Sequence, residues 1–303
     1  MKLPIKYSEN LQQDIKSGKP VVALESTIIT HGMPWPQNYE TAKAVENVIR
    51  SGGAQPATIA VLDGVLRVGL DDSELESLAR TDDAAKLSTA DLPYCLVKGT
   101  TGSTTVAATM CAAHHAGIKV FATGGIGGVH RDVDQSFDIS ADLSELSRTP
   151  VTVVCAGAKA ILDLPKTFEA LETMAVPVIA WQSDFLPAFW SSRSPLAAPL
   201  RFDQPDDVAG FLQIRQQLAI QGGVLVCNPV PQAQEIPYAA MEKYISKALQ
   251  LAKQQNVKGK QVTPFLLKQI YQLTSGASLE TNINLIKNNA SLATRLACAI
   301  SIH

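Results

Sequence analysis

Two ionisable side chains stand where apolar segments of this sequence end, and both residue types can do chemistry there. Lys159 follows the run VTVVCAGA, and Glu25 closes the run VVALE. A lysine held just past a buried strand can act as a neutral amine and form an imine with a carbonyl carbon. A carboxyl group at a buried strand end resists ionisation, which suits a general acid. The structural alternatives are a solvated lysine that opens a surface helix and a glutamate held in an ion pair.

The segment 99–117, GTTGSTTVAATMCAAHHAG, is rich in glycine and hydroxyl residues and then becomes an alanine-rich apolar stretch. Backbone N–H groups and hydroxyls at the start of such a helix can hold an anion, phosphate being the obvious one. The segment is not a Walker loop, because no Gly-Lys-Ser/Thr follows the glycines. Serine and threonine also begin helices simply as N-caps, so the structural alternative stays open.

The segment 123–130, TGGIGGVH, has a histidine at the third glycine position of the dinucleotide fingerprint, which argues against NAD binding. Several aspartates follow it, and their carboxylate oxygens are hard metal ligands. One or two such carboxylates together with water molecules are the usual way to hold magnesium or manganese. Their spacing is not that of an EF-hand, and each one could instead be a helix cap or a turn residue. These carboxylates are Asp132, Asp134, Asp138 and Asp142.

Apolar runs that alternate with helical patterns predict an α/β fold with ligand-binding loops at one end of a mostly parallel sheet. Asp63-Gly64, inside ATIAVLDGVLRVGL, predicts a hairpin of two short strands. The N-terminal stretch is expected to be helical up to Gly18. No repeat or interdomain linker is evident, so residues 1–303 are expected to form one domain.

The later part of the chain is expected to be more irregular at first and then helical. The segment 182–207 carries four prolines together with Phe and Trp residues that look exposed, and we expect a lid or a subunit contact there. The remainder, from Glu235 to His303, is expected to be mostly helical, with breaks at QQNVKGKQVTP and at TSGASLETN, where Ser278 or Thr281 could start the final helix.

The composition narrows the class of protein. The chain has 303 residues and a formal net charge of −2, which gives no electrostatic reason to expect nucleic-acid binding. Its five cysteines include no CxxC pair and indicate free thiols in a reducing compartment. The N-terminus has no signal-like apolar core, and no apolar run approaches the roughly 18 residues of a membrane span. We therefore expect a cytoplasmic protein without a membrane partner.

Several long blocks of the sequence resemble the pseudouridine-5'-phosphate glycosidases, from Val21 to the final helix. The resemblance implies a three-layer α/β/α fold with a large mixed, mostly parallel sheet and a helical C-terminal part, assembled as a homotrimer. The blocks are ALESTIITHGMPWPQN, AVLDGVLRVGL, DLPYCLVKGTTGSTTVAATM, GIKVFATGGIGGVHR, FDISADLSELSRTPVTVVCAGAKAILDLPKTFEALET, and TPFLLKQI with SLETNINLIKNNA.

The resemblance also implies a reaction. The family reversibly cleaves the C–C glycosidic bond of pseudouridine 5'-phosphate to uracil and ribose 5-phosphate, with a divalent cation that is typically Mn²⁺. Lys159 would form the imine with the ring-opened sugar, Glu25 would donate a proton, and Asp138 would bind the metal. The 5'-phosphate could be held by the segment 99–110, Lys86 or His130. The implied substrate contacts are Lys86, Val106, His130, Ser140, Ala141, Asp142 and Asn282.

Some positions depart from the family's pattern, namely Thr89-Ala90, Thr100-Thr101 and Ser275, and none of them is assigned to chemistry. Two other functions are compatible with the residues. Another Schiff-base lyase or aldolase acting on a phosphosugar would keep Lys159 and would not need uracil. A non-catalytic phosphosugar-binding protein would tolerate the replacement of Lys159.

Overall fold

A large mixed sheet organises the chain, which a computed structural model describes over residues 2–257 and 262–302. Within these ranges eleven strands form one sheet, in the order β1-β4-β3-β2-β7-β8-β11-β9-β10, and the pair β5–β6 joins it through β3. The strands are β1 (Ile5–Tyr7), β2 (Val21–Leu24), β3 (Gln55–Leu62), β4 (Val65–Val68), β5 (Ala85–Leu87), β6 (Gly102–Thr104), β7 (Val120–Ala122), β8 (Thr152–Cys155), β9 (Val178–Trp181), β10 (Leu200–Phe202) and β11 (Val224–Cys227).

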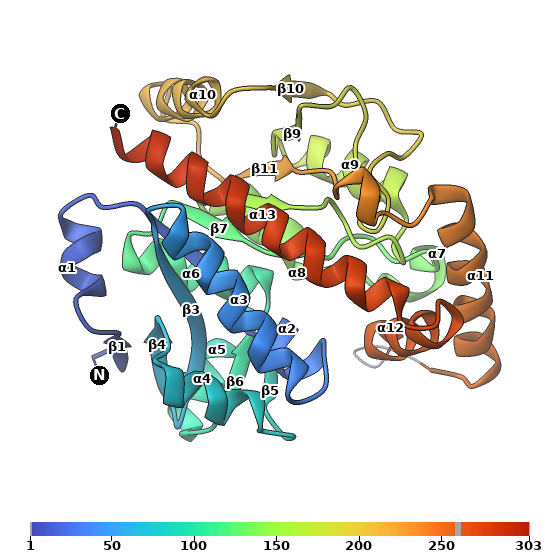
Figure 1. Cartoon of the computed structure of the whole chain (residues 1–303), viewed down its shortest axis with the longest axis horizontal. Coiled ribbons are helices and arrows are strands. Elements are labelled where there is room, and N and C mark those ends of the chain that lie inside the picture. The colour runs from blue at the N-terminus through green and yellow to red at the C-terminus, as the bar shows by residue number, and fades with distance from the viewer. Residues whose placement is uncertain (1, 258–261, 303) are drawn as a thin grey trace.

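Helices cover both faces of this sheet (Figure 1). α3 and α13 pack against each other on one face, and α13 contacts β2, β7 and β8, while α6 and α8 pack together on the other face. The helices are α1 (Leu11–Lys16), α2 (Thr27–His31), α3 (Gln37–Ser51), α4 (Asp72–Ala79), α5 (Leu92–Lys98), α6 (Val106–Ala116), α7 (Val133–Ser136), α8 (Ala141–Arg148), α9 (Leu164–Thr173), α10 (Pro205–Gln217), α11 (Tyr238–Gln254), α12 (Val262–Leu273) and α13 (Ala277–Ile302). The three-layer α/β/α prediction is therefore confirmed.

The central strands are short, continuous apolar runs. Every residue of β2, β7, β8 and β11 is buried, as parallel strands covered on both faces require. β2 pairs in parallel with β7, and β7 pairs in parallel with β8. The residues that follow these strands therefore emerge at the same edge of the sheet.

The Asp63-Gly64 hairpin is present as predicted. Both residues have positive φ angles, 50° and 71°, and β3 and β4 pair antiparallel from Leu62 and Val65 outward. A type I′ turn needs this left-handed backbone at both central positions, and Asp-Gly tolerates it. Only β3–β4 and β3–β6 are antiparallel among the pairings of the described strands, which makes the sheet mixed but mostly parallel.

The prediction of an N-terminal helix up to Gly18 is right for α1 and wrong before it. Residues Ile5–Tyr7 form β1, an edge strand that pairs in parallel with β4. The partner of a three-residue edge strand lies far along the chain, so the local pattern carries no signal for it. Gly18 itself has a φ of 75° and follows α1.

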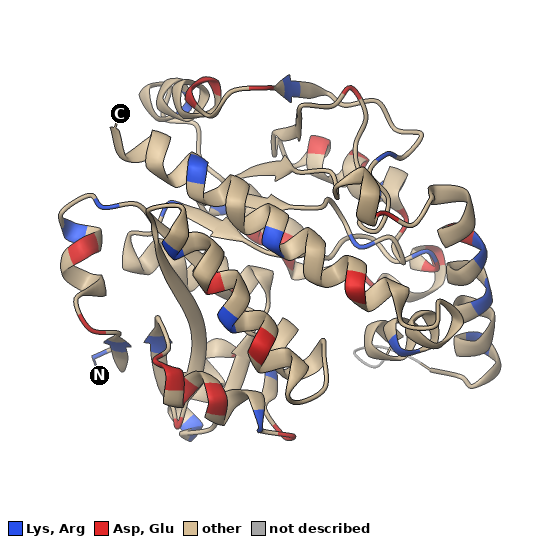
Figure 2. Cartoon of the chain, viewed as in Figure 1, with Lys and Arg blue, Asp and Glu red and all other residues tan. Residues whose placement is uncertain are grey.

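The C-terminal part is helical, as expected. α11 ends at Gln254 and α12 begins at Val262, so the predicted break is present, although its residues 258–261 lie outside the described ranges. Basic and acidic residues alternate along the described elements of the fold, with neither kind gathered in one part of it (Figure 2). Within the described ranges, no helix has both the length and the apolar character needed to cross a bilayer.

Candidate active site

A cavity enclosing about 700 Å³ of empty space, part of it open to solvent, lies at the carboxyl ends of β2, β7 and β8. α12 and the start of α13 close it from the other side. Four of the side chains assigned from the sequence line it together, namely Glu25, Lys86, Lys159 and Asn282. They come from positions distant in sequence, and the parallel register of the sheet is what brings the strand ends together.

Glu25 is the first residue after β2, and the register places it beside Thr123. Leu24 pairs with Ala122, so the next residue of each strand meets its neighbour across the sheet edge. The Thr123 hydroxyl donates to one carboxyl oxygen of Glu25, and the Thr27 hydroxyl donates to the other. Glu25 is buried and Thr123 is completely so. Two hydroxyl groups therefore fix the orientation of this carboxyl group.

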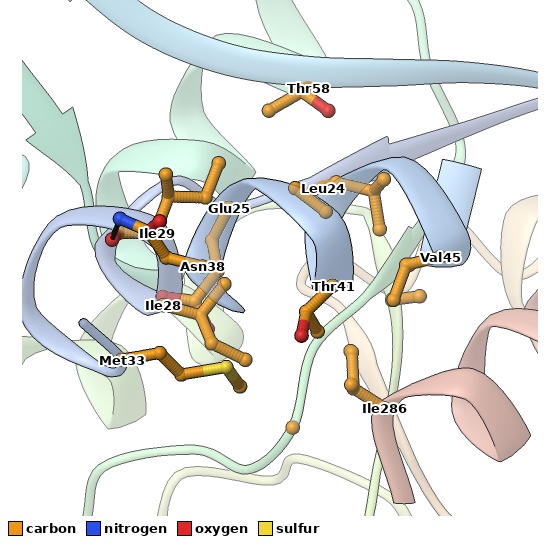
Figure 3. Close-up of a pocket in the computed structure, with 13 residues that line it drawn as sticks. Leu24, Glu25, Ile28, Ile29, Met33, Asn38, Thr41, Val45, Thr58 and Ile286 are labelled. Carbon is orange, nitrogen blue, oxygen red and sulfur yellow. Dashed lines mark hydrogen bonds between the residues drawn. The ribbon is translucent and has the colours of Figure 1, made fainter. Parts of the chain in front are cut away.

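A second pocket lies behind Glu25, with about 420 Å³ of empty space (Figure 3). Its walls are mostly apolar side chains of β2, α2 and α3, among them Leu24, Ile28 and Val45. Asn38 is one of its buried polar residues, and the Asn38 amide donates to the backbone oxygens of Ile29 and Ala79. Glu25 thus lines both the mostly apolar pocket and the larger cavity that contains Lys159.

Lys159 lies in the loop after β8, not in a surface helix. Its backbone N–H donates to Ile126 O at 3.0 Å, and the preceding residue, Ala158, forms a β-bridge with Ile126. Gly157 has a φ of 86°, and a Cβ there would lie 3.0 Å from Pro187 O. The loop is therefore tightly held, and it directs a half-buried Lys159 to the cavity that also contains Lys86.

Lys86 and His31 lie on one side of the cavity. Lys86 is the central residue of β5, and a turn at residues 89–91 follows this strand. His31 is the last residue of α2. Partial burial, and then the positive charge of Lys86, lower the pKa of the His31 imidazole. Sequence reasoning missed His31 as a site residue, and its place in the same ALESTIITHG block as Glu25 was the available signal.

Asn282 contributes an unusual polar atom to the cavity wall. Its Oδ1 is buried and has no hydrogen-bond partner among the described residues. Leaving a buried acceptor unpaired costs about 1–3 kcal/mol, so such an atom indicates a missing donor. The donor would come from a ligand with an N–H or O–H group, because Asn282 faces the cavity.

The expectation of exposed aromatic residues in the segment 182–207 is wrong for its central part. Phe189 and Trp190 are buried, and the Trp190 indole N–H donates to Ser278 O at 3.0 Å. Phe189 also lines the cavity, where its ring lies against Gly125 so closely that a Cβ at Gly125 would be 2.6 Å away. The segment was expected to form a lid or a subunit contact, and its central aromatic residues pack beside the cavity.

The other assigned residues do not line this cavity. Val106 is the first residue of α6, Ser140 is the N-cap of α8, and Ala141 and Asp142 begin α8. Asp142 is buried, and its carboxylate accepts hydrogen bonds from the backbone N–H groups of Ala107 (2.9 Å) and Gly127 (2.7 Å). The start of α6, which the sequence suggested as an anion site, therefore binds a carboxylate of the protein itself.

His130 and Asp138 lie together in the loop around α7, with 3.8 Å between His130 Nε2 and Asp138 Oδ2. The backbone N–H of His130 also donates to the backbone oxygen of Asp138 at 3.1 Å, which connects the two ends of the loop. Within the part of the chain that the structure describes, no group of three or more His, Cys, Asp and Glu side chains is placed to hold a metal ion. The candidate metal ligands in this loop are thus the carboxylate of Asp138 and the imidazole of His130.

Asp142→Ala is expected to lower the free energy of unfolding by about 3 kcal/mol, because it leaves two buried N–H donors without their charged acceptor. Urea unfolding followed by circular dichroism measures this. Asp82→Ala, at an exposed loop position, is the matched control and should leave the unfolding midpoint unchanged. If Asp142→Ala unfolded at the wild-type midpoint, Asp142 would not be the structural clamp that these contacts indicate.

Comparison with known proteins shows which family the chain belongs to. Residues 10–299 match the sequence profile of the family described as "Indigoidine synthase A like protein". A pseudouridine-5'-phosphate glycosidase from Paracoccus denitrificans is 58% identical over 299 residues, 98% of each chain. One from Solibacter usitatus is 56% identical, over 97% of this chain and 98% of its own. The chain belongs to the pseudouridine-5'-phosphate glycosidase family.

Solved structures agree with this placement. The prealnumycin C-glycosynthase AlnA, crystallised in complex with ribulose 5-phosphate, superposes with a TM-score of 0.92 at 36% identity, covering 100% of this chain and 98% of its own. An indigoidine synthase A-like protein from Thermotoga maritima superposes with a TM-score of 0.90 at 33% identity, covering 99% of this chain and 97% of its own. Both similarities extend over the whole fold, including every strand that borders the cavity.

Proposed function

We propose that the chain is an enzyme that cleaves the C–C glycosidic bond of pseudouridine 5'-phosphate with water, and reversibly forms uracil and ribose 5-phosphate. The observation that carries the proposal is the convergence of Glu25, Lys86, Lys159 and Asn282 on one cavity. Relatives that carry the glycosidase name are more than half identical to this chain over almost its full length, and a neighbour with the same fold binds a pentose phosphate.

Lys159 is the nucleophile of the proposed mechanism. A C-glycoside has no heteroatom leaving group, so the protonation used by ordinary glycosidases does not help. Attack of the Lys159 amine on C1' forms a C1'–N bond, and the C1'–O4' bond breaks as the ring oxygen takes a proton. The nitrogen lone pair then forms a C=N bond while the C1'–C5 bond to uracil breaks. The amine attacks in its neutral form, and Lys86 lines the same cavity.

Glu25 is the acid that protonates C5 of the departing uracil. The carbon accepts the Glu25 proton, and the electron pair of the C1'–C5 bond returns to the uracil ring. Water then hydrolyses the imine, releases ribose 5-phosphate and returns a proton to Glu25. The apolar pocket behind Glu25 and the two threonine hydroxyls hold the carboxyl group in one orientation for this transfer.

The two ends of the substrate are matched by different residues. The unpaired Asn282 Oδ1 suits an N–H donor of the uracil ring. Lys86 is the candidate for the 5'-phosphate, because it lines the cavity whereas His130 does not. The N–H of Ala107, at the start of α6, is already bonded to Asp142.

We also propose that Asp138 holds a divalent cation, Mn²⁺ in the first instance, with His130 beside it. One carboxylate and one imidazole fit an ion that keeps several of its waters. When bound, the ion would supply positive charge that orients a phosphorylated substrate. Val106, Ser140, Ala141 and Asp142 are retained as proposed contacts of the substrate only through the family resemblance.

Asp138→Asn is expected to weaken Mn²⁺ binding at least about tenfold, because a neutral amide is a poorer ligand than a carboxylate. Isothermal titration of the substrate-free protein with Mn²⁺ measures this directly. Asp134→Asn, at an exposed aspartate of α7, is the matched control and should bind like the wild type. Equal affinities for all three proteins would remove Asp138 from the metal site.

The assembly and the compartment are further parts of this proposal. We propose a homotrimer in the cytoplasm, supported by the family resemblance, by the exposed apolar side chains of Phe137, Ile214 and Leu218, and by five free cysteines. Light scattering coupled to size exclusion should give three times the 32.4-kDa chain mass. A monomer at all concentrations would contradict the trimer.

The reaction is tested by incubating the pure protein and Mn²⁺ with pseudouridine 5'-phosphate and following uracil by chromatography. Borohydride added with ribose 5-phosphate should fix a covalent adduct on Lys159, which mass spectrometry locates. Uracil release together with this adduct supports the proposal. An adduct with other phosphosugars but no uracil release would indicate a different Schiff-base lyase. If folded protein gave neither uracil nor an adduct, the result would indicate a binding protein.

A further inference from the structure

His31, the last residue of α2, lines the cavity and is exposed to solvent. It shares the cavity with Glu25, Lys86 and Lys159, which are the charged groups that face it. α3, α4 and β6 also pack against α2, and among the described residues none of their charged side chains lines the cavity. His31 is therefore a titratable group of this site that the mechanism above leaves without a role.

Two hydroxyl groups bear on which nitrogen of the neutral His31 imidazole carries the proton. His31 Nδ1 lies 2.6 Å from Thr30 Oγ1, and the Thr30 hydroxyl donates its hydrogen to Ser103 Oγ at 2.8 Å. Because that hydrogen is used, Thr30 accepts from Nδ1–H. The neutral imidazole then carries its lone pair on Nε2, the nitrogen available to a bound substrate. Ser103 is completely buried, so the pair of hydroxyls is firmly placed.

The surroundings of His31 favour the neutral imidazole. Partial burial and the charge of Lys86 lower its pKa from the ordinary value of 6.5, so the free base is the main form at pH 7. As the pH falls through that lowered pKa, the imidazolium forms and the Nε2 acceptor is lost.

The proposed reaction needs a proton carrier in addition to Glu25. When the C1'–N bond forms, the Lys159 nitrogen must lose a proton, and when the C1'–O4' bond breaks, O4' must gain one. Glu25 keeps its own proton for C5 of uracil, in the following step. A single base that takes the first proton and returns it as the second would balance ring opening without any other reagent.

We propose that His31 is this proton carrier: its Nε2 accepts a proton from the Lys159 nitrogen and delivers it to O4' of the sugar. The inference rests on the proposed function. Thr30 and Ser103 are positioning residues, since they hold Nδ1 and leave Nε2 to the substrate.

The test compares His31→Gln and His31→Ala with the wild type and with His114→Gln, an exposed histidine near the end of α6. We expect His31→Gln to lower kcat for uracil release by about 10²–10⁴-fold, with KM little changed. In the wild type, protonation of His31 should lower kcat at acid pH. This contribution should be absent from the kcat–pH profile of His31→Gln. Added imidazole should restore activity to His31→Ala and not to Lys159→Ala. His114→Gln should match the wild type.

Other results would overturn the inference. A wild-type kcat and KM in His31→Gln would make His31 dispensable. A raised KM with an unchanged kcat would make it a binding residue. A loss in His31→Ala that imidazole does not restore would make its role structural. A wild-type protein that releases no uracil would overturn the proposed function itself, and the inference with it, so the two failures are told apart by the wild-type assay.

Discussion

Lys159→Ala is expected to reduce uracil release by on the order of 10⁴-fold or more, because removing the nucleophile of a covalent mechanism removes the route and not merely a contact. The Lys159 side chain is the amine that reaches the cavity from the tightly held loop after β8, so a water molecule in its place cannot form an imine. The rate of uracil release at saturating substrate measures the effect.

The control for this variant is Lys98→Ala, at an exposed lysine of α5, which should keep full activity. Borohydride with ribose 5-phosphate should label the wild type and Lys98→Ala and leave Lys159→Ala unlabelled. Uracil release that survives in Lys159→Ala would remove the imine from the mechanism while keeping the substrate. Labelling at another lysine would move the nucleophile.

Glu25→Gln is expected to reduce uracil release by about 10²–10⁴-fold, since the amide keeps the shape of the side chain and cannot donate a proton to carbon. Gln can still bond with the hydroxyls of Thr27 and Thr123, so the fold around β2 should be preserved. The variant should still form the borohydride-trapped adduct with ribose 5-phosphate, because imine formation from the free sugar does not involve C5 of uracil.

Adduct formation without uracil release would distinguish the role of Glu25 from that of Lys159. Glu76→Gln, at an exposed glutamate of α4 that pairs with Arg80, is the matched control and should behave like the wild type. If Glu25→Gln released uracil at the wild-type rate, another acid would have to protonate C5. If it lost the adduct as well, Glu25 would act at the sugar.

The relatives differ in the direction that their names describe. Those from Paracoccus denitrificans and Solibacter usitatus are named for cleavage of a glycosidic bond, and AlnA is named for synthesis of a C-glycoside. A catalyst lowers the barrier equally in both directions, so one arrangement of acid and amine can serve both names. The direction in a cell then depends on the concentrations of uracil, ribose 5-phosphate and the C-nucleotide.

The local sequence predicted the α/β architecture and several of the chemical groups in the cavity, although it missed β1 and His31. The short apolar runs that became β2, β7 and β8 favoured buried strands, and Asp63-Gly64 favoured its hairpin. Lys159 and Glu25 became candidates because ionisable residues at the ends of such strands are costly to bury, and the family resemblance supplied their roles.

The tertiary structure decided which of those groups meet. The register of β2 with β7 sets Thr123 beside Glu25, and no local pattern encodes a contact between residues so far apart. The same is true of His31, which became a site residue only when β5 brought Lys86 and β6 brought Ser103 to α2. Local sequence specifies strands and turns through short-range sterics, whereas a site is built by long-range pairing that burial of the whole sheet selects.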